Sequence, residues 1–313
     1  MITHIVAAEQ PVAESISYGS IWPEHHIFAD AERGLSDDVS ANLGRTFQIR
    51  RYTDEGKMLA DLREGALNIA STSAIGRIVP AAALMYLPYL YRDFAHYRRV
   101  WQLGDNRVVL KIEDLIRKTA NMEVLGYSLV GGRDCILVDK PIYGVADFEG
   151  LSIRVDEATV STSIFDQLKA SPKRIPFFEV AEALKHRRVL AAENAPFNML
   201  TLGWHNHCKF VSCTCHRFLL NFELANTVFW NELGTRNRVS LGDAFAKYLD
   251  AFADRADAER TVSLNSLSRK HGLRVNVIEP TRRQPLEAAC ECVVSNFAAT
   301  HELHSEIELI RRF

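Results

Sequence analysis

The densest group of potential metal ligands in this sequence lies within residues 205–216. The stretch contains His205, His207, Cys208, Cys213, Cys215 and His216. Histidine and cysteine are the side chains that zinc prefers. Residues 210–215, however, have the pattern of a strand, and structural zinc ligands usually have at least two residues between paired cysteines. Three interpretations remain open: a core strand with packed thiols, a zinc site, or a cysteine nucleophile that lacks an obvious activating base.

The whole chain has six cysteines, the others being Cys135, Cys290 and Cys292. An even number permits disulfides in an oxidising compartment. The two Cys-x-Cys pairs fit poorly to a strain-free bridge within each pair. Free buried thiols, disulfides and metal ligation therefore all remain possible fates of these residues.

The sequence has none of the common catalytic signatures. It has no Gly-x-Gly-x-x-Gly, no phosphate-binding loop, no Gly-x-Ser-x-Gly and no His-Glu-x-x-His. The histidines of Glu24-His25-His26 are too close together for the zinc-helix spacing. They indicate a surface turn or helix start, or a polar contact at the mouth of a pocket.

One arginine has a position suited to anion binding. Arg154 lies in the strand predicted over residues 151–155, between Ile153 and Val155. A guanidinium directed into a cleft from a strand end can form two parallel charge-assisted bonds to a carboxylate. The alternative is a structural salt bridge, for instance to Asp147 or Asp156.

The elements that must position these residues alternate between strands and helices. A strand at 46–50, a helix at 56–65 and a strand at 66–70 form a β-α-β unit, which favours a parallel or mixed sheet. Further strands are predicted at 122–126, 151–155, 210–215 and 273–278. Helices are predicted at 157–170, 179–188, 226–233, 241–255, 286–297 and 302–312. The pattern predicts an α/β fold, with two sheets favoured over one.

Composition excludes several classes of protein. The chain has 313 residues, of which 47% are hydrophobic and 24% charged, so it is globular rather than disordered, and its length favours two domains. Its 37 basic and 39 acidic residues give a net charge of -2, so charge provides no argument for nucleic acid as a partner. The longest apolar run, 80–90, is too short to insert in a membrane. Residues 1–6 lack the features of a signal peptide, which indicates either a cytoplasmic protein or a mature or recloned form.

Several segments together resemble the solute receptors of tripartite ATP-independent periplasmic (TRAP) transporters. The matching residues are Leu62 to Ile69, Pro80, Leu87 to Leu90, Arg133, Pro141, Asp147 to Val155, Ala170 to Pro172, Pro176 to Val180, Ala183, Leu184, Glu193, Asn194, Lys209, Phe210, Thr214 and His216. They cover roughly residues 40–235 in the order and spacing of that family. Two departures are Val189-Leu190-Ala191, where the family usually has Val-Asp-Gly, and Ala181, where it commonly has tyrosine.

The resemblance implies a two-lobed fold like that of periplasmic binding proteins, with a mixed sheet in each lobe, a ligand cleft between the lobes and a long lobe-spanning helix. It implies a first lobe of residues 1–130 plus 220–259 and a second of 131–219 plus 260–313. It also implies a periplasmic receptor, not an enzyme, that has no cofactor or metal, binds a small carboxylate and delivers it to the TRAP membrane permease subunits.

The resemblance further assigns the ligand site. The residues it implies are Arg154 for the ligand carboxylate, Arg133, Asn194, Phe177, and Thr72 and Ser73 for polar contacts, with Trp22 and Trp204 placed by location only. The alternatives are a zinc- or cysteine-dependent enzyme acting on a small organic acid, and a ligand sensor, on the same fold.

Overall fold

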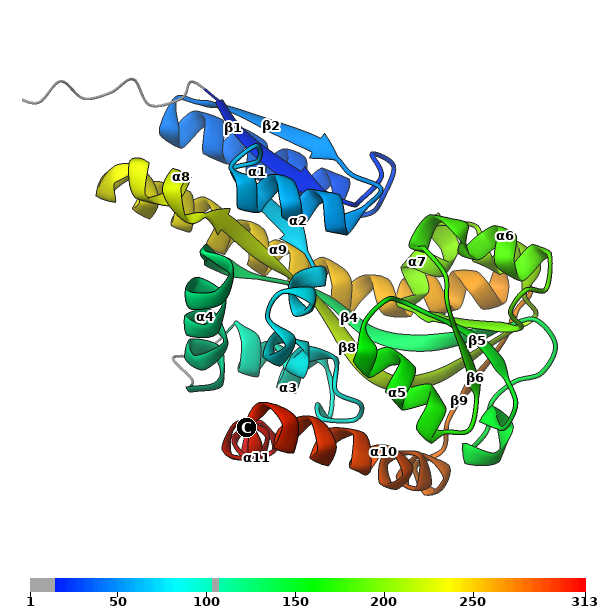
Figure 1. Ribbon diagram of the computed structural model, residues 1–313. Helices are drawn as coiled ribbons and strands as arrows, with labels where there is room; N and C mark the ends of the chain where they lie inside the picture. The colour runs from blue at the N-terminus through cyan, green and yellow to red at the C-terminus, as the bar shows by residue number, and fades with distance from the viewer. Residues whose placement is uncertain (1–14, 103–106) are drawn as a thin grey trace, which may run out of the picture.

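The computed structural model describes residues 15–102 and 107–313, so the start of the chain at 1–6 lies outside the described residues. They form an α/β protein of two lobes (Figure 1). The strands are β1 (Ser15–Ser20), β2 (Thr46–Arg51), β3 (Ile69–Thr72), β4 (Met122–Leu137), β5 (Ser152–Val155), β6 (Ser171–Arg174), β7 (Ala191–Asn194), β8 (Phe210–Asn226) and β9 (Arg274–Val277). Within the described residues these strands make one sheet in the order β2-β1-β3-β8-β4-β7-β5-β6, with β9 beside β8.

The two long strands β4 and β8 run through both lobes (Figure 1). They are antiparallel, and their pairing extends from Met122 opposite Asn226 to Leu137 opposite Phe210. At about 3.4 Å per residue, a strand of 16 residues spans roughly 50 Å. The expectation of two separate sheets is therefore corrected, because these crossing strands join the mixed sheet of each lobe into one.

The pairing of β4 with β8 is interrupted at glycines. Register shifts lie between Val124 and Gly126 and between Leu129 and Gly131, where the glycines have φ of 146° and 103°. A Cβ on Gly126 would lie 2.2 Å from Cδ1 of Leu249 in the long helix α9 (Gly234–Arg269). Glycine is therefore needed here both for its backbone conformation and for the close approach of that helix.

Each lobe contains a parallel three-stranded unit. In the first, β1 pairs in parallel with β2 and β3, and in the second β5 pairs in parallel with β6 and β7. Helices α1 (Ala29–Leu43) and α2 (Glu55–Glu64) connect the strands of the first unit, and α5 (Thr159–Gln167) and α6 (Val180–Lys185) those of the second. The side chain of Asp54 caps α2 by accepting from the backbone N–H of Gly56 and Lys57.

The remaining helices surround the crossing strands. They are α3 (Phe94–Trp101), α4 (Arg107–Ala120), α7 (Pro196–Thr201), α8 (Thr227–Glu232), α9 (Gly234–Arg269), α10 (Pro280–His301), α11 (His304–Arg312) and the 3-10 turns η1 (Ala74–Arg77), η2 (Pro80–Tyr86), η3 (Val145–Phe148), η4 (Phe177–Glu179) and η5 (Trp204–His207). Helix α9 has 36 residues and packs against β4, α1 and α7, so the expected lobe-spanning helix is present. None of the helices in the described part of the chain has the length and apolar character needed to span a bilayer.

Candidate ligand-binding site

A cavity of about 310 Å³ lies where the carboxyl ends of both parallel units meet. Its walls include Trp22 after β1, Ser73 after β3, Arg154 near the end of β5, Phe177 after β6 and Asn194 at the end of β7. In α/β proteins the crevice outside the carboxyl ends of parallel strands is the usual place for a ligand, because loops of variable sequence converge there. Arg133 of β4 also lines the cavity.

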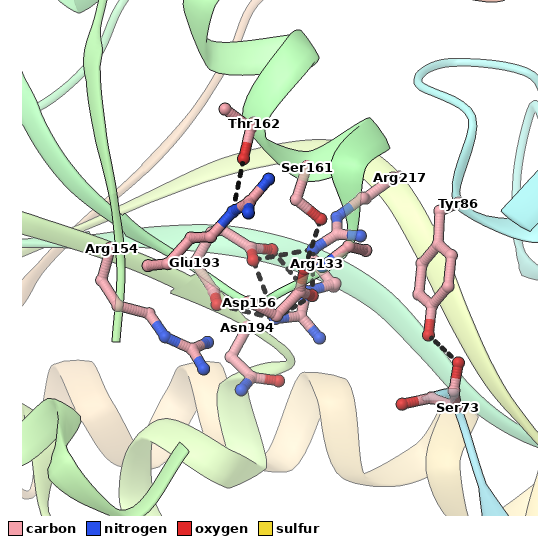
Figure 2. Close-up of polar contacts among 12 residues, drawn as sticks. Ser73, Tyr86, Arg133, Arg154, Asp156, Ser161, Thr162, Glu193, Asn194 and Arg217 are labelled. Carbon is pink, nitrogen blue, oxygen red and sulfur yellow. Dashed lines mark hydrogen bonds and ion pairs between the residues drawn. The ribbon is translucent and has the colours of Figure 1, made fainter. Parts of the chain in front are cut away.

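The guanidinium of Arg154 is buried but only partly bonded. The residue is 3% exposed, and its Nε donates to the carbonyl of Ile175 at 2.9 Å. Neither terminal nitrogen has a hydrogen-bond or ion-pair partner among the described residues, and Figure 2 shows the guanidinium without a contact to the other labelled side chains. Burial lowers the pKa of Arg154 to about 10, even though Asp156 and Glu193 raise it. Such a group favours an incoming anion.

Two other arginines lie near Arg154, and both are paired with carboxylates. Arg217 donates through Nη2 to Asp156 and to Glu193, each at 2.8 Å (Figure 2). Arg133 binds both carboxylate oxygens of Glu193. Burial raises the pKa of Glu193, but Arg133 and Arg217 together bring it well below the ordinary value. Three guanidiniums thus face two carboxylates, and the excess positive charge belongs to Arg154.

Arg133 is less available than the resemblance implies. Besides its ion pair with Glu193, its Nη2 donates to the backbone carbonyl of the same residue at 3.0 Å. Its Nη1 is the one nitrogen of this side chain with no partner in the described part of the chain. The structure therefore places Arg133 mainly as the counter-ion of Glu193, with one nitrogen left for the cavity.

Asn194 is oriented by its neighbours. Its Oδ1 accepts from the backbone N–H of Ala195 at 2.8 Å and from Nδ2 of Asn198 at 2.9 Å. Its Nδ2 is left as a donor on the cavity wall, which Arg154 of β5 also lines. Because Asn198 also contacts His26 at 2.8 Å, the orientation depends on both lobes.

Trp22 supplies an aromatic part of the first lobe's wall, and His26 packs against it. The rings are stacked with centroids 4.4 Å apart, and burial lowers the pKa of His26 to about 4. His26 is 3% exposed, so the expectation of a surface turn is wrong for this residue. Trp22 is 2% exposed and lines the cavity, and its Nε1 has no acceptor among the described residues.

Two of the expected site residues lie behind the wall rather than on it. Trp204 is 1% exposed; the guanidinium of Arg154 lies 6.0 Å from its ring, and Phe177 packs edge-on against it at 6.1 Å. Thr72 is buried and donates to Oε1 of Glu55 at 2.9 Å. The expectation of direct ligand contact is therefore corrected for Trp204 and Thr72, which support residues that line the cavity.

An ion pair between the lobes separates this cavity from a second one. Arg77, at the end of η1, pairs with Glu157, which follows β5. Both residues line the first cavity and also a neighbouring cavity of about 710 Å³ that extends toward α5 and α10. Glu55, Ser73 and Asp156 line both cavities as well.

The cysteine and histidine stretch does not converge on one point. Within the described residues, no group of three or more histidine, cysteine, aspartate or glutamate side chains is arranged to hold a metal ion. All six cysteines are free thiols, and burial raises the pKa of Cys208 and Cys213 to about 12 and that of Cys215 to about 11. These thiols are neutral near pH 7, so they are poor nucleophiles and poor metal ligands.

Several residues of the site were not predicted from the sequence. They are Glu55, Asp156 as the counter-ion of Arg217 rather than of Arg154, Glu193 as the partner of two arginines, Arg217, Asn198 and Asn221. Glu193 was noted only as part of the resemblance, next to Asn194. Arg217 had a detectable signal, because an arginine inside an otherwise apolar strand (residues 217–220) must have a buried partner.

Fold and site together define a class. A two-lobed α/β chain with crossing strands and an underpaired buried guanidinium at the carboxyl ends of its parallel units is a solute-binding protein of the periplasmic type. More specifically, residues 19–301 match the model of the bacterial extracellular solute-binding proteins, family 7, and the chain belongs to that family.

Known relatives agree with this assignment. A solute-binding protein of Sulfitobacter sp. is 26% identical over 65% of this chain and 63% of its own length. The sialic acid-binding periplasmic protein of Vibrio cholerae is 27% identical over 74% of this chain and 73% of its own length. The crystal structure of a TRAP periplasmic solute-binding protein from Roseobacter denitrificans with bound β-D-glucuronate superposes with a TM-score of 0.87 at 24% identity, covering 95% of this chain and 99% of that one. At that identity the superposition shows the fold alone.

Proposed function

We propose that this chain captures a small organic acid in the 310 Å³ cavity and delivers it to a TRAP-type membrane permease from outside the cytoplasmic membrane. The family supports the receptor role, and its solved members include proteins with bound glucuronate and galacturonate. The observation that carries the proposal is the guanidinium of Arg154, which is 3% exposed and has two terminal nitrogens without partners among the described residues.

The physical argument rests on desolvation. A buried guanidinium is unfavourable unless an anion pairs with it, whereas one in contact with water is stable. A ligand carboxylate can accept from both terminal nitrogens of Arg154, and closure of the lobes removes water and strengthens those bonds. The ligand thereby stabilises the closed arrangement through its higher affinity for it, which is what a delivery protein requires.

The other proposed ligand contacts surround that anchor. Asn194 offers Nδ2 as a second donor, and Arg133 offers Nη1. Phe177 and Trp22 cover the apolar part of the ligand, and Ser73 belongs to the wall of the other lobe. Binding without chemistry is the function proposed, because the buried thiols described above are protonated near neutral pH.

Isothermal titration of the protein with a panel of sugar acids, keto acids, dicarboxylates and aromatic acids tests this proposal. We expect Arg154→Ala to weaken binding of the best acid by about 2–5 kcal/mol, or roughly 30- to 5,000-fold. The matched control is Arg174→Ala, which removes an exposed arginine from the neighbouring strand β6. Arg154→Lys retains the charge but loses the planar fork, and should bind with intermediate affinity.

Two results would contradict the proposal. The first is an Arg154→Ala protein that unfolds at the wild-type temperature and binds the acid as tightly as the wild type. The second is a folded wild-type protein that binds none of the acids in the panel. Delivery is tested separately, by measuring whether the loaded protein supports uptake of the same acid through a TRAP permease in membrane vesicles.

A further inference from the structure

The part of the cavity wall formed by the first lobe carries hydrogen-bond acceptors rather than free cations. Glu55, the first residue of α2, lines the cavity. Its Oε1 accepts from Oγ1 of Thr72 and from the backbone N–H of Ser73, both at 2.9 Å, whereas Oε2 has only a 3.3 Å contact with Oγ of Ser73. The nearby cation Arg77 is paired with Glu157. Oε2 of Glu55 is thus available as an acceptor.

Asn221 of β8 supplies a second acceptor, and its neighbours determine which atom faces the cavity. The residue is 1% exposed and lines the cavity, and its Nδ2 donates to Oγ of Ser71 at 3.2 Å. Ser71 in turn donates its hydroxyl proton to Oε1 of Glu223 at 2.8 Å. Because the single proton of Ser71 is used in this way, the serine can only accept from Asn221. Oδ1 of Asn221 therefore remains for the cavity, with no donor in the described part of the chain.

Glu223 determines the direction of the hydrogen bonds that run from Asn221 through Ser71. Oε2 accepts from the hydroxyl of Tyr18 at 3.0 Å, and Oε1 also accepts from Ser128. Burial raises the pKa of Glu223 to about 7, with a further contribution from Glu32, and Tyr248 of α9 is close to it. Above that pH the carboxylate can only accept, so the hydroxyls around it must donate. Glu223 does not line the cavity; it is a positioning residue for Asn221.

The cavity thus has hydrogen-bond donors on one wall and acceptors on the other wall. One side presents donors: the terminal nitrogens of Arg154 and Nδ2 of Asn194. The other side presents acceptors on Glu55 and Asn221. The guanidinium of Arg154, which has no carboxylate bonded to it among the described residues, suits one carboxylate, and a second carboxylate next to Glu55 would be repelled.

We propose that the ligand is a monocarboxylate that carries hydroxyl groups, with its carboxylate on Arg154 and with separate hydroxyls donating to Asn221 and to Glu55. This inference rests on the proposed function and adds the part of the ligand that the second wall selects. Asn221 offers a neutral acceptor, and the carboxylate of Glu55 is already stabilised at the start of α2. Both acceptors suit a hydroxyl donor better than an ammonium group, because an ammonium group would need an unpaired anion. A ligand without hydroxyls leaves Oδ1 of the buried Asn221 unpaired and gives Oε2 of Glu55 no further donor, which is an arrangement that gives strong selectivity.

The experiment compares matched acids by isothermal titration at about pH 8.5, where Glu223 is ionised. D-glucuronate is paired with cyclohexanecarboxylate and D-erythronate with butyrate, so that each pair differs mainly in its hydroxyls. Succinate tests a second carboxylate, and 4-aminobutyrate tests an ammonium group. We expect the better of the two hydroxylated acids to bind at least about 100-fold more tightly than its partner, because the site would be built to bond a hydroxyl. Succinate and 4-aminobutyrate should bind no better than butyrate.

Three variants locate the selectivity. Asn221→Leu should reduce the preference for the hydroxylated acid at least tenfold, while the affinity for its partner changes less than threefold. Glu223→Gln should reduce the same preference, although it touches no ligand, because the glutamine amide can donate to Ser71 and release the orientation of Asn221. Glu55→Gln should improve succinate binding tenfold or more. The matched control is Asn206→Leu, at an exposed asparagine outside the cavity.

The outcomes separate the two proposals. If the wild type binds acids but shows no preference for hydroxyls, or prefers succinate or 4-aminobutyrate, this inference is overturned and the carboxylate receptor stands. If no acid binds to the folded protein, both fail. A Glu223→Gln protein that keeps the full preference overturns the positioning role. Thermal unfolding checks that each variant is folded. If Asn221→Leu does not fold, Glu55→Gln tests the same wall, because Glu55 lies at the partly exposed start of α2.

Discussion

The pairing of Glu193 with two arginines yields a sharp prediction about stability. Glu193 is 0% exposed, and its Oε1 lies 2.8 Å from Nη2 of both Arg133 and Arg217. Nε2 of His216 lies 3.5 Å from its other oxygen. Replacement by glutamine preserves the volume, removes the charge and turns an amide N–H₂ group toward one guanidinium. Removing one member of a buried ion pair costs about 3–5 kcal/mol, because the partner charge remains buried without compensation.

Urea unfolding followed by circular dichroism measures this loss. With an m-value of about 3 kcal/mol/M, a loss of 3–5 kcal/mol lowers the midpoint by roughly 1–1.7 M. The matched control is Glu182→Gln, at an exposed residue of α6 that pairs with Lys185, and its midpoint should stay at the wild-type value. Arg217→Met, which removes a cation instead, should partly restore stability when combined with Glu193→Gln, because fewer unpaired charges remain.

The same prediction has a pH dependence of known sign. The two guanidiniums lower the pKa of Glu193 below that of an unfolded glutamate, so the stability it supplies is fully present above about pH 4.3 and is lost as the pH falls through the lower folded value. The difference between the wild type and Glu193→Gln should therefore be constant from pH 8 to about 5.5 and shrink in acid. A difference below about 1 kcal/mol at pH 7 would refute the reasoning, because it would mean that the arginines do not depend on this carboxylate.

Two further predictions concern the contacts between the lobes. Arg77→Gln removes the ion-pair partner of Glu157 and should leave the urea midpoint nearly unchanged, because both side chains are half exposed. It should speed ligand release in stopped-flow measurements, because it opens the boundary between the two cavities. An unchanged release rate would contradict the role of this ion pair in closure. Burial lowers the pKa of His26 to about 4, so the unfolded chain takes up a proton at higher pH than the folded one, and up to about 3 kcal/mol of stability present above pH 6.5 should be lost as the pH falls to 4. His26→Gln should flatten that part of the pH–stability curve, and an unchanged curve would show that another group titrates there.

Much of the architecture could be predicted because it depends on local patterns. The alternation at 46–50 and 151–155 corresponds to β2 and β5, and the apolar spacing of Val160 and Ile164 to the buried side of α5. The strand predicted at 122–126, in contrast, is only the start of β4, which continues to Leu137. Glycines at 126, 131 and 132 weaken the strand signal there, although the register shifts at Gly126 and Gly131 let the strand cross between the lobes.

The site could be predicted only in part, for a physical reason. Arg154 and Asn194 could be expected on the cavity wall because each lies in a short strand in a segment that resembles the family. Their contact with a ligand stays a prediction. Arg133 was expected to bind the ligand, yet Glu193, sixty positions away, occupies most of its donors. Which of several arginines is left without a carboxylate partner depends on how β4, β7 and β8 pair, and no single segment contains that information.

Under the proposed function, the distribution of charge predicts how binding and closure would be coupled. Arg133 and Arg217 already have carboxylate partners in this structure, so we expect them to contribute less than Arg154 to the difference in affinity between open and closed lobes. Arg154 differs, because its terminal nitrogens have only water or a ligand as partners among the described residues. Closing the lobes over it without an anion would desolvate an uncompensated charge, whereas closing them over a carboxylate forms two charge-assisted bonds. A bound acid can shift the balance only by this difference in affinity, and in the proposed function it is Arg154, the guanidinium of the three with no bonded carboxylate, that creates it.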